Sequence, residues 1–226
     1  MCYRRERADD ERLRLEYIAG GARAMQDSDD GWASSLGYLE RAVDAAARNG
    51  VPTVCFTSGG SRALSWEDAA DRAVDRFGPL VERARDAGVA VALENTMSIR
   101  SGISFVHTVA DTAALARLHG VGLCVDLYSA WQERGLMRTL ADNLDAIHLF
   151  QIGDHRVEIT SVPTRWVPGD GHIPLDRLVR EVRELGYAGL VDLELLGPAI
   201  DDEGPESALG HGLDWMRTHV PVPAGI

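Results

Sequence analysis

The chain has 226 residues, of which 45% are hydrophobic and 26% are charged, so it can form a globular domain with a sizeable core. Its formal net charge is −12, which argues against a nucleic-acid partner, because such binding rests on Lys and Arg side chains that face phosphates. All 23 basic residues are arginines, and the absence of lysine excludes Schiff-base chemistry on this chain.

The cysteines and the N-terminal residues indicate a cytoplasmic protein. Cys2, Cys55 and Cys124 show no metal-type spacing, and the last two lie inside apolar runs, so they are typical of small core residues. The first residues are rich in charge and contain no signal-peptide core, and no run reaches the roughly 18 apolar residues of a membrane span. We therefore expect neither a disulfide framework nor a membrane partner.

The sequence divides into a charged segment, residues 1–33, and a domain over residues 34–226. We expect the first segment to be helical, with a helix over 11–25, and to hold no strand. In the domain, helices are predicted near residues 36–49, 65–87, 106–118, 136–143, 175–185 and 207–219. Between them lie five short apolar runs typical of buried parallel strands, at residues 52–57, 89–94, 121–126, 146–151 and 190–195.

Four of these runs end in, or near, an oxygen-bearing side chain. These side chains are Glu94, Asp126, Gln151 and Glu194. The alternation of strands and helices predicts an α/β fold, and in a closed β/α barrel all strand C-termini meet at one mouth. Three carboxylates and an amide oxygen would form a hard-oxygen site suited to Mg²⁺ or Mn²⁺, with Zn²⁺ or Co²⁺ as alternatives.

The chain resembles the xylose isomerase-like TIM barrels, the sugar phosphate isomerase/epimerase group. The resemblance runs from about Leu36 to about Gly204. Its most specific parts are, in order, the segments 151–154, 165–175, 186–189 and 192–195. The family fold is a (β/α)8 barrel, whereas five strands are visible here, so the resemblance implies a barrel that is incomplete at its N-terminus.

The resemblance also implies roles for individual residues. The family's metal ligands match Glu94, Asp126, Gln151 and Glu194 one by one, and the two glutamates are the implied acid/base pair. Arg165 matches a residue that faces substrate oxygens. Ser129 stands where many members have a histidine after the second ligand, and Asp154 follows Gln151 closely, so both are predicted to bind substrate or to orient a ligand. His148 is the alternative to Gln151, although strand alternation places it on the opposite face.

These residues predict an isomerase or epimerase that removes a proton next to a carbonyl through an enediolate, on a small polyhydroxylated substrate of carbohydrate metabolism. A dehydratase acting on a keto-polyol or a dehydroshikimate-like keto acid is an alternative, since it begins with the same step. A non-catalytic shortened barrel that acts as a binding protein is a third. Because no earlier strand is visible, strands 52–57 and 190–195 are expected to be sheet edges, and an exposed edge favours a homo-oligomer.

Overall fold

The computed structural model describes residues 2–5, 13–25, 29–159, 161 and 164–220. It divides the chain into two compact units. The first comprises residues Met1–Cys124 with Ala146–His148, and the second comprises Val125–Asp145 with Leu149–Ile226.

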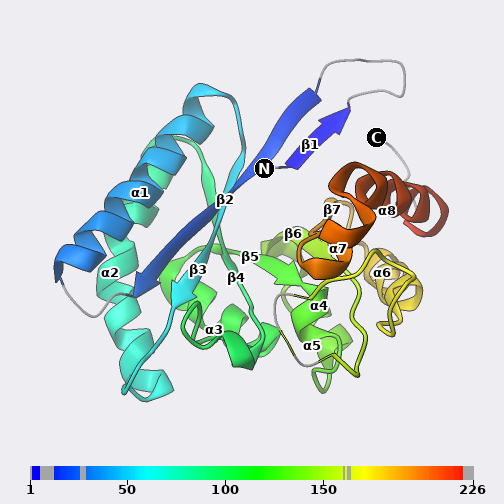
Figure 1. The fold of residues 1–226 in the computed structure, drawn as a ribbon. Coiled ribbons are helices and arrows are strands. Elements are labelled where there is room, and N and C mark those ends of the chain that lie inside the picture. Colours follow the sequence, from blue (N-terminus) through cyan, green and yellow to red (C-terminus); the bar gives the residue numbers. More distant parts are fainter. Residues whose placement is uncertain (1, 6–12, 26–28, 160, 162–163, 221–226) are drawn as a thin grey trace. The chain divides into compact units, whose positions relative to one another are not determined.

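The first unit is built on a mostly parallel sheet (Figure 1). Strand β1 pairs antiparallel with β2, and β2 pairs parallel with β3. Strand β3 pairs parallel with β4, and β4 pairs parallel with the first residues of β5. The strands are β1 (Cys2–Arg5), β2 (Leu13–Met25), β3 (Thr53–Gly59), β4 (Ala90–Glu94) and β5 (Gly122–Asp126).

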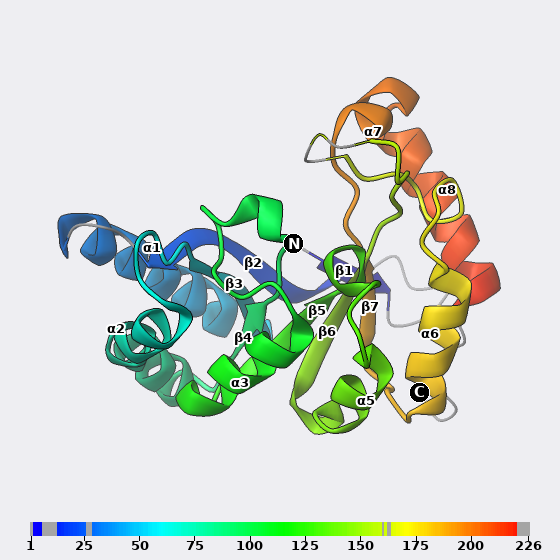
Figure 2. The ribbon, with the colours of Figure 1, turned by 90° about the horizontal axis from the view of Figure 1, so that it is seen from below.

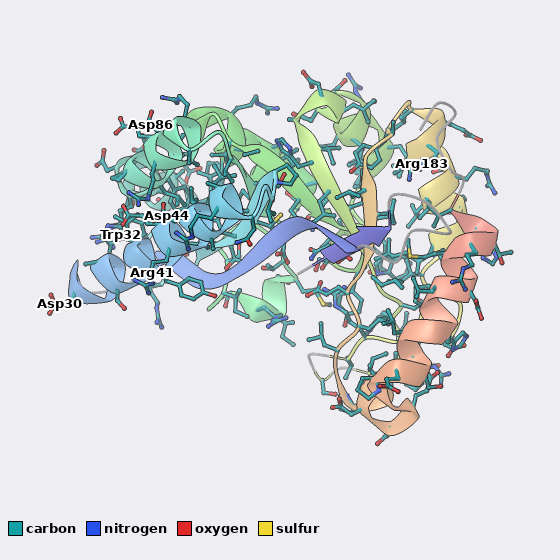
Figure 3. All side chains as sticks on the ribbon, turned by 90° about the horizontal axis from the view of Figure 1, so that it is seen from above. Asp30, Trp32, Arg41, Asp44, Asp86 and Arg183 are labelled. Carbon is teal, nitrogen blue, oxygen red and sulfur yellow. The ribbon has the colours of Figure 1, made fainter. Side chains whose placement is uncertain are left out.

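Helices pack against these strands, and α1 and α2 lie beside β2 and β3 in Figure 1. The helical elements are α1 (Asp29–Arg48), α2 (Trp66–Asp86), the 3-10 turn η1 (Ser98–Arg100) and α3 (Val109–His119). Ser65 caps α2, because its hydroxyl accepts a hydrogen bond from the Asp68 backbone N–H at 3.1 Å. Figure 3 shows Asp44 on α1; its carboxylate lies 2.6 Å from the guanidinium of Arg83 on α2.

The core of the first unit explains why its strands are continuous apolar runs. Phe56 of β3 and Phe77 of α2 are fully buried, and their rings meet edge-to-face with centroids 5.1 Å apart. Leu93 of β4 and Leu123 of β5 are also buried. A strand covered in this way has no polar face, so its sequence loses the alternation that marks a half-exposed strand.

The second unit begins at the end of β5 and continues through helices and two paired strands. Strand β6 pairs parallel with β7, with Gln151 opposite Asp192. Helix α6 lies beside α8, which follows α7 (Figure 2). The elements are α4 (Leu127–Ala130), α5 (Leu136–Ala141), the 3-10 turn η2 (Leu144–Ala146), β6 (Ile147–Ile152), α6 (Leu175–Glu184), β7 (Leu190–Leu193), α7 (Pro198–Glu203) and α8 (Pro205–His219).

The five predicted strands are confirmed, but the prediction for the N-terminal segment is wrong. Residues 13–25 form β2 and not a helix. The apolar residues Leu13, Leu15 and Tyr17 alternate with charged ones, which is the period of a strand, and two consecutive glycines at 20 and 21 disfavour a helix. Because β2 pairs with β3, the expectation that strand 52–57 forms a sheet edge is also wrong.

The predicted domain division between residues 33 and 34 stays a prediction, although α1 runs across that position. Among the helices within the described ranges, none combines the length and the apolar character needed to cross a membrane.

Candidate active site

Asp126 ends β5 and begins α4, and this local geometry holds its carboxylate in place. The side chain is 2% exposed. Its Oδ1 accepts a hydrogen bond from the Tyr128 backbone N–H at 3.1 Å, as an N-cap residue does. Its Oδ2 accepts a hydrogen bond from the Ser129 hydroxyl at 2.6 Å. Ser129, predicted to contact substrate, thus contacts the predicted ligand Asp126, and its substrate role stays a prediction.

Arg165 joins Asp126 to Glu194. Its guanidinium donates two hydrogen bonds to Asp126, from Nη1 to Oδ1 at 3.1 Å and from Nη2 to Oδ2 at 2.9 Å. The same Nη2 lies 2.5 Å from Oε2 of Glu194. The two-point contact with Asp126 uses the fork geometry that only arginine offers. The structure therefore brings three predicted site residues together in the second unit.

The Arg165 side chain is fixed from several sides. It is 4% exposed, and its guanidinium lies over the Tyr128 ring, 4.1 Å from the centroid. Its backbone N–H donates to the Leu196 carbonyl at 3.1 Å. A Cβ added to Gly153 would come within 3.1 Å of Arg165 Cδ, so a glycine at this position leaves room for the arginine. A buried guanidinium held in this way is part of a prearranged site.

Gln151 lies on β6, and Glu194 directly follows β7, the strand that pairs with β6 in the same unit. Gln151 is buried on β6 and pairs in register with Asp192 of β7. The Glu194 backbone N–H donates to the Ile152 carbonyl at 2.9 Å, which extends the pairing one residue beyond β7. Side chains alternate along a strand, so Asp192 and Glu194 share the face of Gln151. Along β6, His148 is exposed, which favours Gln151 over His148 as the strand's inward polar residue.

Asp154 organises the long loop that carries Arg165. Its Oδ1 accepts the backbone N–H groups of His155 at 2.8 Å and Ile173 at 3.0 Å, and its Oδ2 accepts that of Gly169 at 2.9 Å. Its own backbone exchanges hydrogen bonds of 2.8 and 2.9 Å with Trp166, the residue after Arg165. Asp154 thereby fixes both ends of the loop segment next to the site, and its predicted substrate contact stays a prediction.

Glu94, the fourth predicted ligand, ends β4 in the first unit, where it is half-buried. Buried Asn95 and Thr96 follow it. The strand-end position is confirmed, and the assignment of Glu94 as ligand and acid/base residue stays a prediction.

The donor set of the second unit suits a hard divalent cation. Asp126 and Glu194 supply carboxylate oxygens, and both already lie against one positive charge, the Arg165 guanidinium. Gln151 offers an amide oxygen on the same strand face as Glu194. Oxygen ligands of this kind select Mg²⁺ or Mn²⁺ over softer metals. The residues therefore fit a metal, provided that the Arg165 guanidinium gives up part of its contact with Asp126 and Glu194.

Sequence reasoning missed the role of Tyr128 and the contacts of Arg165 with two carboxylates. The Tyr128 ring lies under the Arg165 guanidinium. The nearest sequence signal is the helix start itself, because Asp126 is the N-cap of α4 and its carboxylate accepts the Tyr128 backbone N–H.

A family model for the xylose isomerase-like TIM barrel matches residues 3–219. The chain belongs to this family. The solved structures agree on the fold: a protein of Sinorhizobium meliloti 1021, named SMc04130, is 23% identical, with a TM-score of 0.82 over 92% of this chain and 79% of that one. The fold is therefore α/β, of the TIM-barrel type.

Two further solved structures resemble this chain. The 3-keto-D-glucoside 4-epimerase YcjR of E. coli is 22% identical, with a TM-score of 0.76 over 91% of this chain and 80% of that one. The IolI protein, crystallised with a bound zinc atom, is 18% identical, with a TM-score of 0.78 over 92% of this chain and 76% of that one. Likeness at this level of identity shows the fold alone. No curated protein matches the chain significantly.

Proposed function

We propose that the protein is a metal-dependent sugar isomerase or epimerase, which removes a proton next to a carbonyl and passes through an enediolate. The observation that carries the proposal is the convergence of two carboxylates, Asp126 and Glu194, on one cationic group. The family membership supports it, and the epimerase among the structural relatives supports the reaction class.

In this proposal Asp126, Gln151 and Glu194 hold a divalent metal, and Glu94 joins them on the strength of the sequence and the family. When bound, the metal would supply Lewis-acid polarisation of the substrate carbonyl. Mg²⁺ or Mn²⁺ suits the oxygen ligands best. The zinc-bound relative supports a divalent ion in this fold and keeps Zn²⁺ as an alternative.

The remaining steps belong to side chains of this chain. Glu194 accepts the proton from the carbon next to the carbonyl, and Glu94 returns it, on the other face in an epimerase or at the neighbouring carbon in an isomerase. Arg165, with its planar fork, binds substrate hydroxyl or carboxylate oxygens once it is released from the carboxylates. Ser129 keeps Asp126 oriented through its 2.6 Å hydrogen bond.

A dehydratase acting on a keto acid or keto-polyol remains the second candidate, and Gln151 in place of a third charged or imidazole ligand is the feature that favours it. We further propose that the substrate is a small polyol or keto acid and that the protein forms a homo-oligomer.

The test is proton exchange. The protein is incubated with Mn²⁺ and a panel of ketoses and keto acids in D₂O, and exchange at the carbon next to the carbonyl is followed by NMR. An isomerase or epimerase yields a rearranged sugar that carries deuterium, whereas a dehydratase yields an unsaturated product. If the metal-loaded protein causes no exchange in any member of the panel while a known epimerase does, the proposal is wrong.

A further inference from the structure

Arg165 contacts carboxylate oxygen atoms of Asp126 and Glu194 that a metal would also need. Nη2 of Arg165 lies 2.9 Å from Oδ2 of Asp126 and 2.5 Å from Oε2 of Glu194. A metal–oxygen bond to the same atoms would be roughly 2.0–2.6 Å long. The Nη2 nitrogen, which is within 2.9 Å of both oxygens, therefore lies close to the position of a cation shared by these two atoms.

The guanidinium also supplies a positive charge that both carboxylates need. Asp126 and Arg165 are almost fully buried, and Glu194 retains 29% side-chain exposure. Two carboxylates close together in a poorly solvated region repel each other and lose hydration, unless a cation compensates both effects. In the described structure, Arg165 provides such a cation.

The backbone of Arg165 is fixed, whereas its guanidinium can move. The backbone of residue 165 is held by the Leu196 carbonyl, so the base of the side chain stays in place. The guanidinium is held by the ion pairs and by the Tyr128 ring. A long side chain can rotate about its outer bonds, and the aromatic face allows the planar group to slide without losing its stacking.

We infer that Arg165 is the resident counter-cation of the site, and that a divalent metal binds only by displacing its guanidinium from Asp126 and Glu194. The inference rests on the proposed metal site. It makes Arg165 a positioning residue that sets the metal affinity of the site. It also couples metal binding to substrate binding, because displacement by the metal frees the guanidinium to bind substrate oxygens.

The inference predicts a ranking of metal affinities in the full-length chain. Arg165→Met removes the competing cation and keeps a long side chain over Tyr128, so Mn²⁺ should bind at least about tenfold more tightly than in the wild type. Arg165→Lys keeps the charge without the two-point fork, so its affinity should lie between the two. Arg134→Met, at an exposed arginine, is the matched control and should leave the affinity unchanged.

The affinities are measured by isothermal titration calorimetry with Mn²⁺, and thermal unfolding is recorded with and without the ion. The metal-free Arg165→Met protein should unfold at a lower temperature than the wild type, and Mn²⁺ should restore more of its stability than it adds to the wild type. If Arg165→Met cannot be purified folded, the comparison of Arg165→Lys with the wild type carries the test.

The outcomes separate the inference from the proposed function. Equal or weaker Mn²⁺ binding in both Arg165 variants, with clear binding in the wild type, overturns the inference and leaves the metal site in place. Absence of binding to Mn²⁺, Mg²⁺ and Zn²⁺ in the wild type and in both variants overturns the metal site and the inference together. A third outcome is wild-type Mn²⁺ affinity in Arg165→Lys together with tighter binding in Arg165→Met. It would show that only the positive charge matters, which contradicts displacement of the two-point guanidinium contact.

Discussion

Asp154→Asn tests whether one buried carboxylate organises the loop that carries Arg165. The wild-type side chain is 1% exposed and accepts three backbone N–H groups, two at Oδ1 and one at Oδ2. Asparagine has the same shape and keeps one acceptor oxygen. Its NH₂ group takes the place of the other oxygen and faces the Gly169 N–H, so one bond is lost and the other two become neutral.

The magnitude follows from these bonds. A hydrogen bond to a charged group contributes about 1.5–3 kcal/mol, and a neutral one about 1 kcal/mol. Losing one charged bond and weakening two others should lower the free energy of unfolding by about 2–4 kcal/mol. For a chain of this size, each kcal/mol shifts the melting temperature by roughly 2–4 °C, so a decrease of about 4–16 °C is expected.

The assay is differential scanning calorimetry together with urea unfolding followed by tryptophan fluorescence, which can reveal separate transitions of the two compact units. Asp202→Asn, at an exposed position of α7, is the matched control and should shift the melting temperature by less than about 1 °C. A shift of Asp154→Asn no larger than that of the control would show that the three N–H contacts do not stabilise the loop as argued.

Three further predictions concern other residues. Glu194→Gln should abolish proton exchange in D₂O, since an amide cannot accept the proton, while circular dichroism stays unchanged; turnover at the wild-type rate would remove Glu194 from the mechanism. Gly171→Ala should destabilise the loop by about 1–3 kcal/mol, because its Cβ would meet Asp154 Oδ1 at 2.3 Å; wild-type urea stability would contradict this contact. Burial lowers the pKa of His119 to about 4, so the unfolded chain binds more protons between pH 4 and 6.5, and stability should fall as the pH decreases through this range. His119→Phe, which keeps the ring next to Phe77, should reduce that acid sensitivity by about 1 kcal/mol after allowance for partial exposure, as measured by urea unfolding at pH 7 and pH 5.

The positions of the five strands after α1 could be predicted from the sequence, because buried parallel strands are continuous apolar runs between helical segments. The strand-end positions of Glu94 and Asp126 followed from the same pattern. The N-terminal strand β2 was missed because its many charged residues obscured the alternation of Leu13, Leu15 and Tyr17, and its pairing with β3 is a long-range contact that no local pattern records.

The contacts of Arg165 lay beyond sequence reasoning for a different reason. Arg165 and Asp126 are 39 positions apart, and a loop residue has no periodicity from which its side-chain direction could be read. A resemblance to the family could assign Arg165 a substrate role, but it could not show that the guanidinium binds two predicted metal ligands at once. The role of Asp154 was hidden similarly, because its three backbone partners depend on the closed shape of the loop.

The central claim is that Asp126, Gln151 and Glu194 hold a divalent metal. The most direct measurement is anomalous X-ray diffraction from crystals grown with Mn²⁺, with data recorded on both sides of the manganese absorption edge. We expect one strong anomalous peak roughly 2.0–2.6 Å from oxygens of Asp126 and Glu194, with the Arg165 guanidinium moved away from both. A fully occupied manganese ion elsewhere, with Arg165 still paired to both carboxylates, would contradict it.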